Sequence, residues 1–140
     1  MSVMRGRATG NCRRDQRGAS ALEMVLIAPV LFLALLAIVQ FGLYFHAKNV
    51  AEQAAQEGAA AARAFDGTEG SAKGVTEDYL SALGDSTLQG RSVSVNRGTQ
   101  TASVTVRGTA LSLIPIPGLA LQIQETASGP VERYVPPADD

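Results

Sequence analysis

The chain has 140 residues, a formal net charge of −1 at pH 7 and one cysteine, Cys12. This length holds one small domain together with accessory segments. A single cysteine excludes an internal disulfide framework and any CxxC metal or redox motif.

Basic residues are concentrated at the N-terminus. Residues 1–18 hold five arginines against Asp15 alone, whereas residues 19–140 hold more acidic than basic side chains. The arginines are Arg5, Arg7, Arg13, Arg14 and Arg17. A short basic segment ahead of an acidic body indicates targeting or membrane topology. Because no basic stripe follows this segment, we expect no nucleic-acid partner.

Residues 24–45, MVLIAPVLFLALLAIVQFGLYF, contain no charged side chain. A helix needs about 20 apolar residues to cross a bilayer, so this run predicts a transmembrane helix over residues 19–45. Pro29 stands in its first turns and Gln40 is its main polar side chain. The alternative of a buried core helix is disfavoured, because so small a protein could hardly cover an apolar helix on every side. The arginines before the run predict a cytoplasmic N-terminus and an outer C-terminal part.

A cleaved secretory signal peptide is a second interpretation of this region. Its apolar part should measure about 7–15 residues and end at a small-residue cleavage site. The run here is longer and ends in FGLYFHAK, which offers no convincing site. The pair Arg13-Arg14 is a weak twin-arginine signal, because polar residues follow it. A mitochondrial presequence is also arginine-rich, but this interpretation would make the spacing of Gly18 and Glu23 a coincidence.

Residues 46–65, HAKNVAEQAAQEGAAAARAF, predict that the helix continues beyond the membrane. Alanine, the strongest helix former, dominates this segment, and proline is absent. Small and apolar residues recur at steps of three and four, so they form a stripe along one face of the helix. The residues of this stripe are Val50, Ala51, Ala54, Gly58, Ala61 and Phe65. Such a face allows close packing against the protein's own globular part or against neighbouring copies. The sequence leaves both open.

Residues 66–140 predict a small outer domain. Residues 66–74, DGTEGSAKG, are typical of a turn-rich break, and residues 72–83 predict a short helix that stops at Gly84. The apolar face expected for this helix is Val75, Tyr79 and Leu83.

From residue 91 the apolar period changes to two, which predicts antiparallel strands. Two strands are expected, joined by a hairpin connection at residues 97–99. Val93 and Val95 of the first strand share one face, and so do Ala102, Val104 and Val106 of the second. Beyond them the apolar residues shift to Leu111 and Leu113, which predicts a β-bulge near Gly108 and Thr109.

The remaining sequence predicts one or two further strands. Residues 119–125 alternate as a third strand, residues 128–130 (SGP) indicate a turn, and residues 131–135 suit a short fourth strand. The expected fold class is therefore α+β. It comprises a long N-terminal transmembrane helix extended outward, a short helix and a small antiparallel sheet of three to four strands.

A glycine and a glutamate mark the start of the apolar run. Gly-x-x-x-x-Glu is a weak pattern by itself, but here Gly18 follows five arginines and Glu23 immediately precedes the span. The combination resembles the type IV prepilin signal. That resemblance implies a leader over residues 1–18, cleavage between Gly18 and Ala19 by a prepilin peptidase, and a role for Glu23 in subunit registration. An interfacial charge without a specific role is the alternative, because a carboxylate costs little at the membrane surface.

The resemblance extends along the helix. Residues 17–64 are similar to the TadE-like family of pseudopilins, at Arg17, Gly18, Ala19, Glu23, Pro29, Phe41, Gly42, Ala54, Ala55, Glu57, Gly58, Ala59 and Ala62. Met24 departs from the tyrosine that often follows the glutamate in the major pilins of these systems. This departure, with the large outer domain, argues against a major pilin.

The family resemblance implies a minor pilin-like component of the tight-adherence (Flp pilus) machinery. It implies a single pass through the inner membrane, residues 46–65 as an extracytoplasmic helix and residues 66–140 as an extracytoplasmic domain. The implied partners are the prepilin peptidase, other pilin-like subunits, Tad inner-membrane assembly proteins and the lipid bilayer. The implied helix-packing residues are Pro29, Gly42, Ala54, Glu57 and Gly58.

Other classes of function have less support in the sequence. His46 is the only histidine and stands at the expected membrane edge, while Glu77 and Asp78 are adjacent on a helix and do not face one another. We therefore expect no catalysis, metal or cofactor. The competing hypothesis is an uncleaved, signal-anchored envelope protein that binds a partner through its outer domain. Only processing at Gly18 separates the two.

Overall fold

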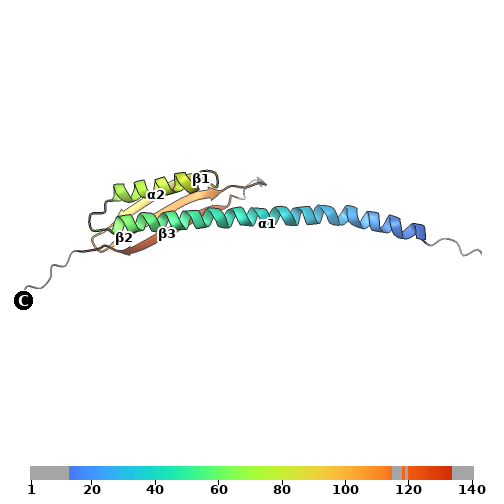
Figure 1. Ribbon diagram of the computed structural model, residues 1–140, viewed down its shortest axis with the longest axis horizontal. Helices are drawn as coiled ribbons and strands as arrows, with labels where there is room; N and C mark the ends of the chain where they lie inside the picture. The colour runs from blue at the N-terminus through green and yellow to red at the C-terminus, as the bar shows by residue number, and fades with distance from the viewer. Residues whose placement is uncertain (1–12, 115–117, 119, 134–140) are drawn as a thin grey trace, which may run out of the picture. The chain divides into compact units, whose positions relative to one another are not determined.

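The computed structural model describes residues 13–114, 118 and 120–133, and it describes no side chains for residues 13–20. The chain divides into two units, Met1–Ile38 and Val39–Asp140. The described part holds helices α1 (Arg13–Arg63) and α2 (Glu69–Leu83) and strands β1 (Leu88–Arg97), β2 (Thr101–Ala110) and β3 (Gln122–Pro130). The first unit contributes α1 as far as residue 38, and the second contributes everything that follows (Figure 1). This is the predicted α+β class.

Strands β1, β2 and β3 form one antiparallel sheet in that order. Val93 pairs with Val106 and Val95 with Val104, so the two predicted valine strands share one face. Gly98 donates its backbone N–H to the carbonyl of Thr101 at 2.8 Å and closes the predicted hairpin. The sheet therefore has a simple up-and-down topology within the second unit.

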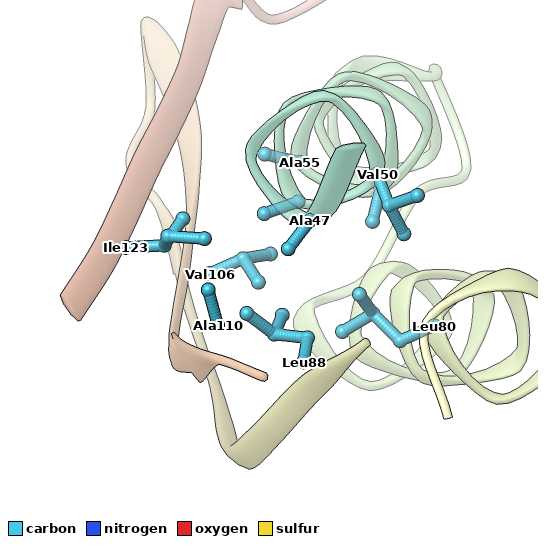
Figure 2. Close-up of a cluster of buried hydrophobic side chains, with 10 residues drawn as sticks. Ala47, Val50, Ala55, Leu80, Leu88, Val106, Ala110 and Ile123 are labelled. Carbon is cyan, nitrogen blue, oxygen red and sulfur yellow. The ribbon is translucent and has the colours of Figure 1, made fainter. Parts of the chain in front are cut away.

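The second unit buries an alanine-rich face of α1 against α2 and the sheet. One cluster brings together side chains from both helices and all three strands, as Figure 2 shows. Its buried members are Ala47, Val50, Ala51, Ala54, Ala55, Leu80, Leu88, Val106, Ala110 and Ile123. A second cluster comprises Ala59, Ala62, Ala72, Ala102 and Val104. Of the two packing partners left open for the alanine stripe, the protein's own sheet and second helix cover it from Val50 to Gly58, whereas Phe65 at its end is 68% exposed.

Helix α2 begins earlier than the sequence predicted. Thr68 accepts a hydrogen bond from the backbone N–H of Ser71 at 3.0 Å, and Ser71 Oγ accepts one from the N–H of Thr68 at 3.1 Å. This capping box satisfies two backbone donors that a helix start leaves without partners. It draws Glu69, Gly70 and Ser71 into the helix, although the sequence predicted a break over residues 66–74. Gly84 ends the helix as predicted, donating its N–H to Leu80.

The buried face of α2 differs from the predicted one, of which only Tyr79 is partly buried and packs against the core. Ala72, Thr76 and Leu80 are buried, whereas Val75 and Leu83 are 41% and 53% exposed. Ala72, Thr76 and Leu80 follow at steps of four and form one face of the helix, and Val75 points about 100° away from Thr76 around the helix axis. The buried hydroxyl of Thr76 keeps a hydrogen-bond partner, because it donates to the carbonyl of Ala72 at 2.8 Å.

The bulge and the last strand also differ from the prediction. A bulge is present at the predicted level, since the register shifts between Gln89 and Ser92, whose partners are Thr109 and Arg107, but its extra residue lies on β1 and not on β2. Gly90 has a φ of +59° there, a conformation that glycine adopts without strain. β2 then ends at Ala110, so the shift to Leu111 and Leu113 marks the end of the strand and not a bulge.

Residues 128–130 continue β3 instead of forming a turn, because they pair with residues 101–103 of β2. A proline is tolerated at the last position of an edge strand, where no partner needs its missing N–H. Residues 131–133 form no strand, which leaves three strands among the described residues. The remainder of the expected fourth strand, residues 134–135, and Leu119 of the expected third strand lie outside the described residues.

Candidate membrane anchor and processing site

The first unit is dominated by large apolar side chains that the protein leaves uncovered. Beginning at Ala21, α1 contains a window with a mean hydropathy of 2.7, none of which is buried. A core helix of a soluble protein would be mostly covered, so burial argues against that alternative. The helix is long and apolar enough to cross a membrane. Its exposed side chains before residue 39 include Leu22, Val25, Leu26, Val30, Leu31, Phe32, Leu33, Leu35 and Ile38.

The residues of the predicted processing signal fall at the start of this segment. Gly18 and Ala19 lie within the bounds of α1, but their side chains are outside the described part of the chain. Glu23 is exposed, three residues after the last undescribed side chain. No contact therefore tests cleavage after Gly18 or the registration role of Glu23, and both stay predictions.

The expected packing residues occupy different surroundings. Pro29 lies inside α1 and is exposed. A Cβ added at Gly42 would meet no atom within 4 Å, so no part of the described chain packs closely on that glycine. Ala54 is fully buried in the core of the second unit. Glu57 is exposed on the same helix.

Gly58 is the point of closest approach between the two helices. A Cβ at this position would overlap Thr76 Oγ1 and lie 3.3 Å from the carbonyl oxygen of Ala72. The glycine therefore lets α2 lie directly on the backbone of α1. These contacts lie within one chain. A role in contacts between subunits stays a prediction for Gly42, Ala54 and Gly58.

Gln40 is a functional candidate that the sequence did not assign. Its side-chain amide donates to the carbonyl of Leu111 at 3.3 Å and accepts from the N–H of Leu113 at 2.9 Å. One side chain thus satisfies a donor and an acceptor of the segment that follows β2. The signal in the sequence was its isolation as the main polar side chain of the apolar run, but its partners lie more than 70 positions away.

The side chain of Arg97 and the backbone of Glu132 close the C-terminal end of α1. Arg97 donates from Nε to the carbonyl of Ala62 at 2.7 Å and from a terminal nitrogen to that of Ala64 at 3.2 Å. The N–H of Glu132 donates to the carbonyl of Arg63 at 2.9 Å. These groups satisfy carbonyls that a helix end leaves without partners, and a cation there favours the helix dipole. Within the second unit, the strands are therefore anchored to α1 at its end as well as along its alanine face.

Several ionisable side chains of the described residues form pairs at the surface. An open depression of about 470 Å³ between α2 and β1 is lined by Lys73, Glu77 and Arg91 among others. Lys73 lies 3.7 Å from Glu77, and Arg91 lies 2.9 Å from Asp85. The described residues contain no cluster of three or more histidine, cysteine or acidic side chains able to hold a metal.

An exposed apolar helix that is long enough to span a membrane, followed by a helix–sheet unit, fits the class of single-helix membrane-anchored proteins. Within that class, residues 18–60 match the model of the family described as TadE-like protein. The chain therefore contains a TadE-like segment, and the resemblance seen in the sequence is confirmed over those residues. The match runs from Gly18 through the apolar segment to the alanine face that packs on the sheet. No curated protein and no solved structure matches the chain.

Proposed function

We propose that this protein is a non-enzymatic, TadE-like minor pilin or pseudopilin of a Flp (Tad) pilus system. One observation carries the proposal: the family match begins at Gly18 and covers the uncovered apolar segment, so the family and the candidate anchor coincide in the chain. The protein would take part in pilus assembly, adhesion or secretion. Its partners would be a prepilin peptidase, other pilin-like subunits, Tad inner-membrane assembly proteins and the lipid bilayer.

The chemistry of the proposed processing site explains the position of Glu23. Cleavage after Gly18 would release a new α-amine on Ala19, which is largely protonated at neutral pH because a free α-amino group has a pKa of about 7.7–8.0. Residues four apart on a helix lie on the same side, so this amine and Glu23 are neighbours in one chain. In an assembly the same carboxylate could pair with the amine of the next subunit. A charge pair at the membrane surface costs far less than an unpaired charge at its centre.

The topology follows the distribution of charge. Arginines precede the apolar segment, so the leader stays in the cytoplasm and the second unit lies on the outer side of the inner membrane. In this arrangement the leader is accessible to a cytoplasm-facing peptidase, and the helix–sheet unit is available to other subunits.

The test is the N-terminal residue of the membrane-associated protein, measured by mass spectrometry in cells with and without an active prepilin peptidase. We expect a chain that begins at Ala19 only where the peptidase is active. Gly18→Ala should abolish this product, and Glu23→Ala should reduce pilus assembly while the protein remains membrane-bound. Glu52→Ala removes an exposed carboxylate elsewhere on α1 and serves as the matched control. A full-length chain in peptidase-positive cells would favour the uncleaved, signal-anchored alternative.

A further inference from the structure

The hydrogen bonds of Gln40 connect the apolar run to a segment of the outer domain. Gln40 lies within the uncharged residues 24–45, and it holds the backbone of Leu111 and Leu113 through both ends of its amide. All three residues belong to the second unit. The segment after β2 is therefore fixed at the level of Gln40 along α1.

Large apolar side chains are exposed at this level. Phe41, next to Gln40, is 64% exposed, while Leu113 and Ile114 are 50% and 38% exposed. Residues 111–114 are uncharged. Exposed apolar side chains that gather beside a membrane segment fit an apolar environment better than water.

Polar groups mark where that environment should end. Lys48, the first charged residue after the apolar run, lies 3.8 Å from Glu125 of β3. Eight residues of helix separate Lys48 from Gln40, which corresponds to about 12 Å at 1.5 Å per residue. Each headgroup layer of a bilayer is roughly 5–7 Å thick. With Gln40 at the edge of the hydrocarbon core, the Lys48–Glu125 pair would lie at the watery side of the headgroups.

Backbone groups outside helices and sheets are tolerated at membrane depth only when they find partners within the protein. Gln40 supplies such partners to the N–H of Leu113 and the carbonyl of Leu111. The same two bonds satisfy the amide of Gln40, which would otherwise be costly in an apolar run. The hydrogen bonds between Gln40 and residues 111–113 thus offset the cost of removing the polar groups of both from water.

We propose that residues 111–114 form a second membrane contact, with Leu113 and Ile114 inserted into the outer bilayer interface and Gln40 holding their backbone in place. This inference rests on the membrane anchoring in the proposed function, and it is independent of processing and of the pilus system. The occupant of the apolar surface is lipid, because the surface is continuous along the chain with the candidate span. The contact would give the outer domain a second attachment to the bilayer besides α1.

The absence of tryptophan from the sequence provides a direct test. A single tryptophan is introduced into the full chain as Leu113→Trp, Phe32→Trp or Phe65→Trp, and each variant is reconstituted in phosphatidylcholine bilayers with brominated acyl chains. Phe32 is an exposed side chain of the candidate span, and Phe65 is exposed beyond the end of α1. Arg63, the last residue of α1, follows Gln40 by 23 positions, which is about 35 Å of helical rise, and Phe65 comes two residues later.

We expect Leu113→Trp to be quenched at least half as strongly as Phe32→Trp, most by bromines close to the headgroups, and Phe65→Trp to stay unquenched. Quenching of Phe32→Trp without quenching of Leu113→Trp would overturn the second contact while leaving the anchor intact. A blue-shifted but unquenched Leu113→Trp would overturn it in favour of a protein partner. If Phe32→Trp is also unquenched, the anchoring in the proposed function fails as well.

The role of Gln40 is tested separately with Gln40→Leu, which keeps the run apolar and removes both hydrogen bonds. Combined with Leu113→Trp, it should reduce the quenching by at least half, while hydrogen exchange of the β2 amides confirms that the domain is folded. Unchanged quenching would show that the segment reaches the bilayer without Gln40 and would overturn this part of the inference.

Discussion

Two parts of helix α1 show opposite relations between side-chain size and burial. Before residue 39 the helix carries leucine, valine, isoleucine and phenylalanine, and nearly all of them are exposed. From Ala47 to Ala62 the residues that face inward are mostly alanine, and they are buried to within a few per cent. The more hydrophobic part is thus the one that no other described residues cover.

The difference lies in what each part packs against. Large side chains that no part of the chain covers need an external apolar solvent, which a bilayer supplies. Alanines contribute little transfer free energy each, but they let a second helix and a sheet approach closely enough for van der Waals contact. One helix can therefore serve a lipid environment and a protein core, according to the side chains at each level.

The largest expected effect comes from placing a charge in the exposed part. Leu33→Arg should weaken membrane insertion of the segment by about 3 kcal/mol, because an arginine near the centre of a span costs about that much on insertion scales. The apparent insertion free energy in a topology reporter assay measures this. Leu33→Ala, the matched control, keeps the position uncharged and should cost well under 1 kcal/mol. Equal insertion of the arginine variant would contradict a span at this level.

The opposite substitution is expected to be harmful in the buried part. Ala54→Leu adds volume where no space remains, since Ala54 is fully buried, and should lower the free energy of unfolding by about 1–3 kcal/mol. Hydrogen exchange of the Val104 and Val106 amides in the full chain, held in detergent micelles, reports this free energy. Leu33→Ala should leave that exchange unchanged. A similar effect of both substitutions would erase the distinction between the two parts of α1.

The sequence predicted these two environments because each has a local signal. An uncharged run and an alanine stripe are patterns of neighbouring residues, as are the alternating valines of β1 and β2. The same is true of Gly84, whose place after an apolar helical pattern predicted the end of α2. The processing motif at Gly18 and Glu23 was also identified from local spacing, and its function remains a prediction.

The failures arise where distant residues decide the outcome. Val75 and Leu83 are more hydrophobic than Thr76, yet they are exposed, whereas Thr76 is buried where α2 lies against Gly58 of α1. Residues 128–130 have a turn-forming composition, but pairing with β2 keeps them in the sheet. The hydrogen-bond partner of the Gln40 amide nitrogen, the carbonyl of Leu111, lies 71 positions away in the sequence. No periodicity within one segment contains this information.

The smallest expected effect tests the close approach of the two helices. Gly58→Ala places a Cβ against Thr76 and should destabilise the second unit by about 1–2 kcal/mol, at the lower end of the usual cost of overpacking. Gly74→Ala is the matched control, because a Cβ at this glycine of α2 meets no atom within 4 Å. Its higher helix propensity should stabilise the unit by up to about 1 kcal/mol. Both are measured as the unfolding free energy of the full chain in micelles.

A double variant distinguishes steric overlap from a general intolerance of Gly58 to substitution. Thr76→Ala removes the hydroxyl that the new Cβ would overlap, while the carbonyl of Ala72 remains at 3.3 Å. The combined loss in Gly58→Ala/Thr76→Ala should therefore be smaller than the sum of the two single losses, by 0.5 kcal/mol or more as is typical of residues in contact. Additive losses would place the cost elsewhere in the helix pair. A coupling of the expected sign would show that the buried part of α1 is selected for closeness and not for hydrophobicity.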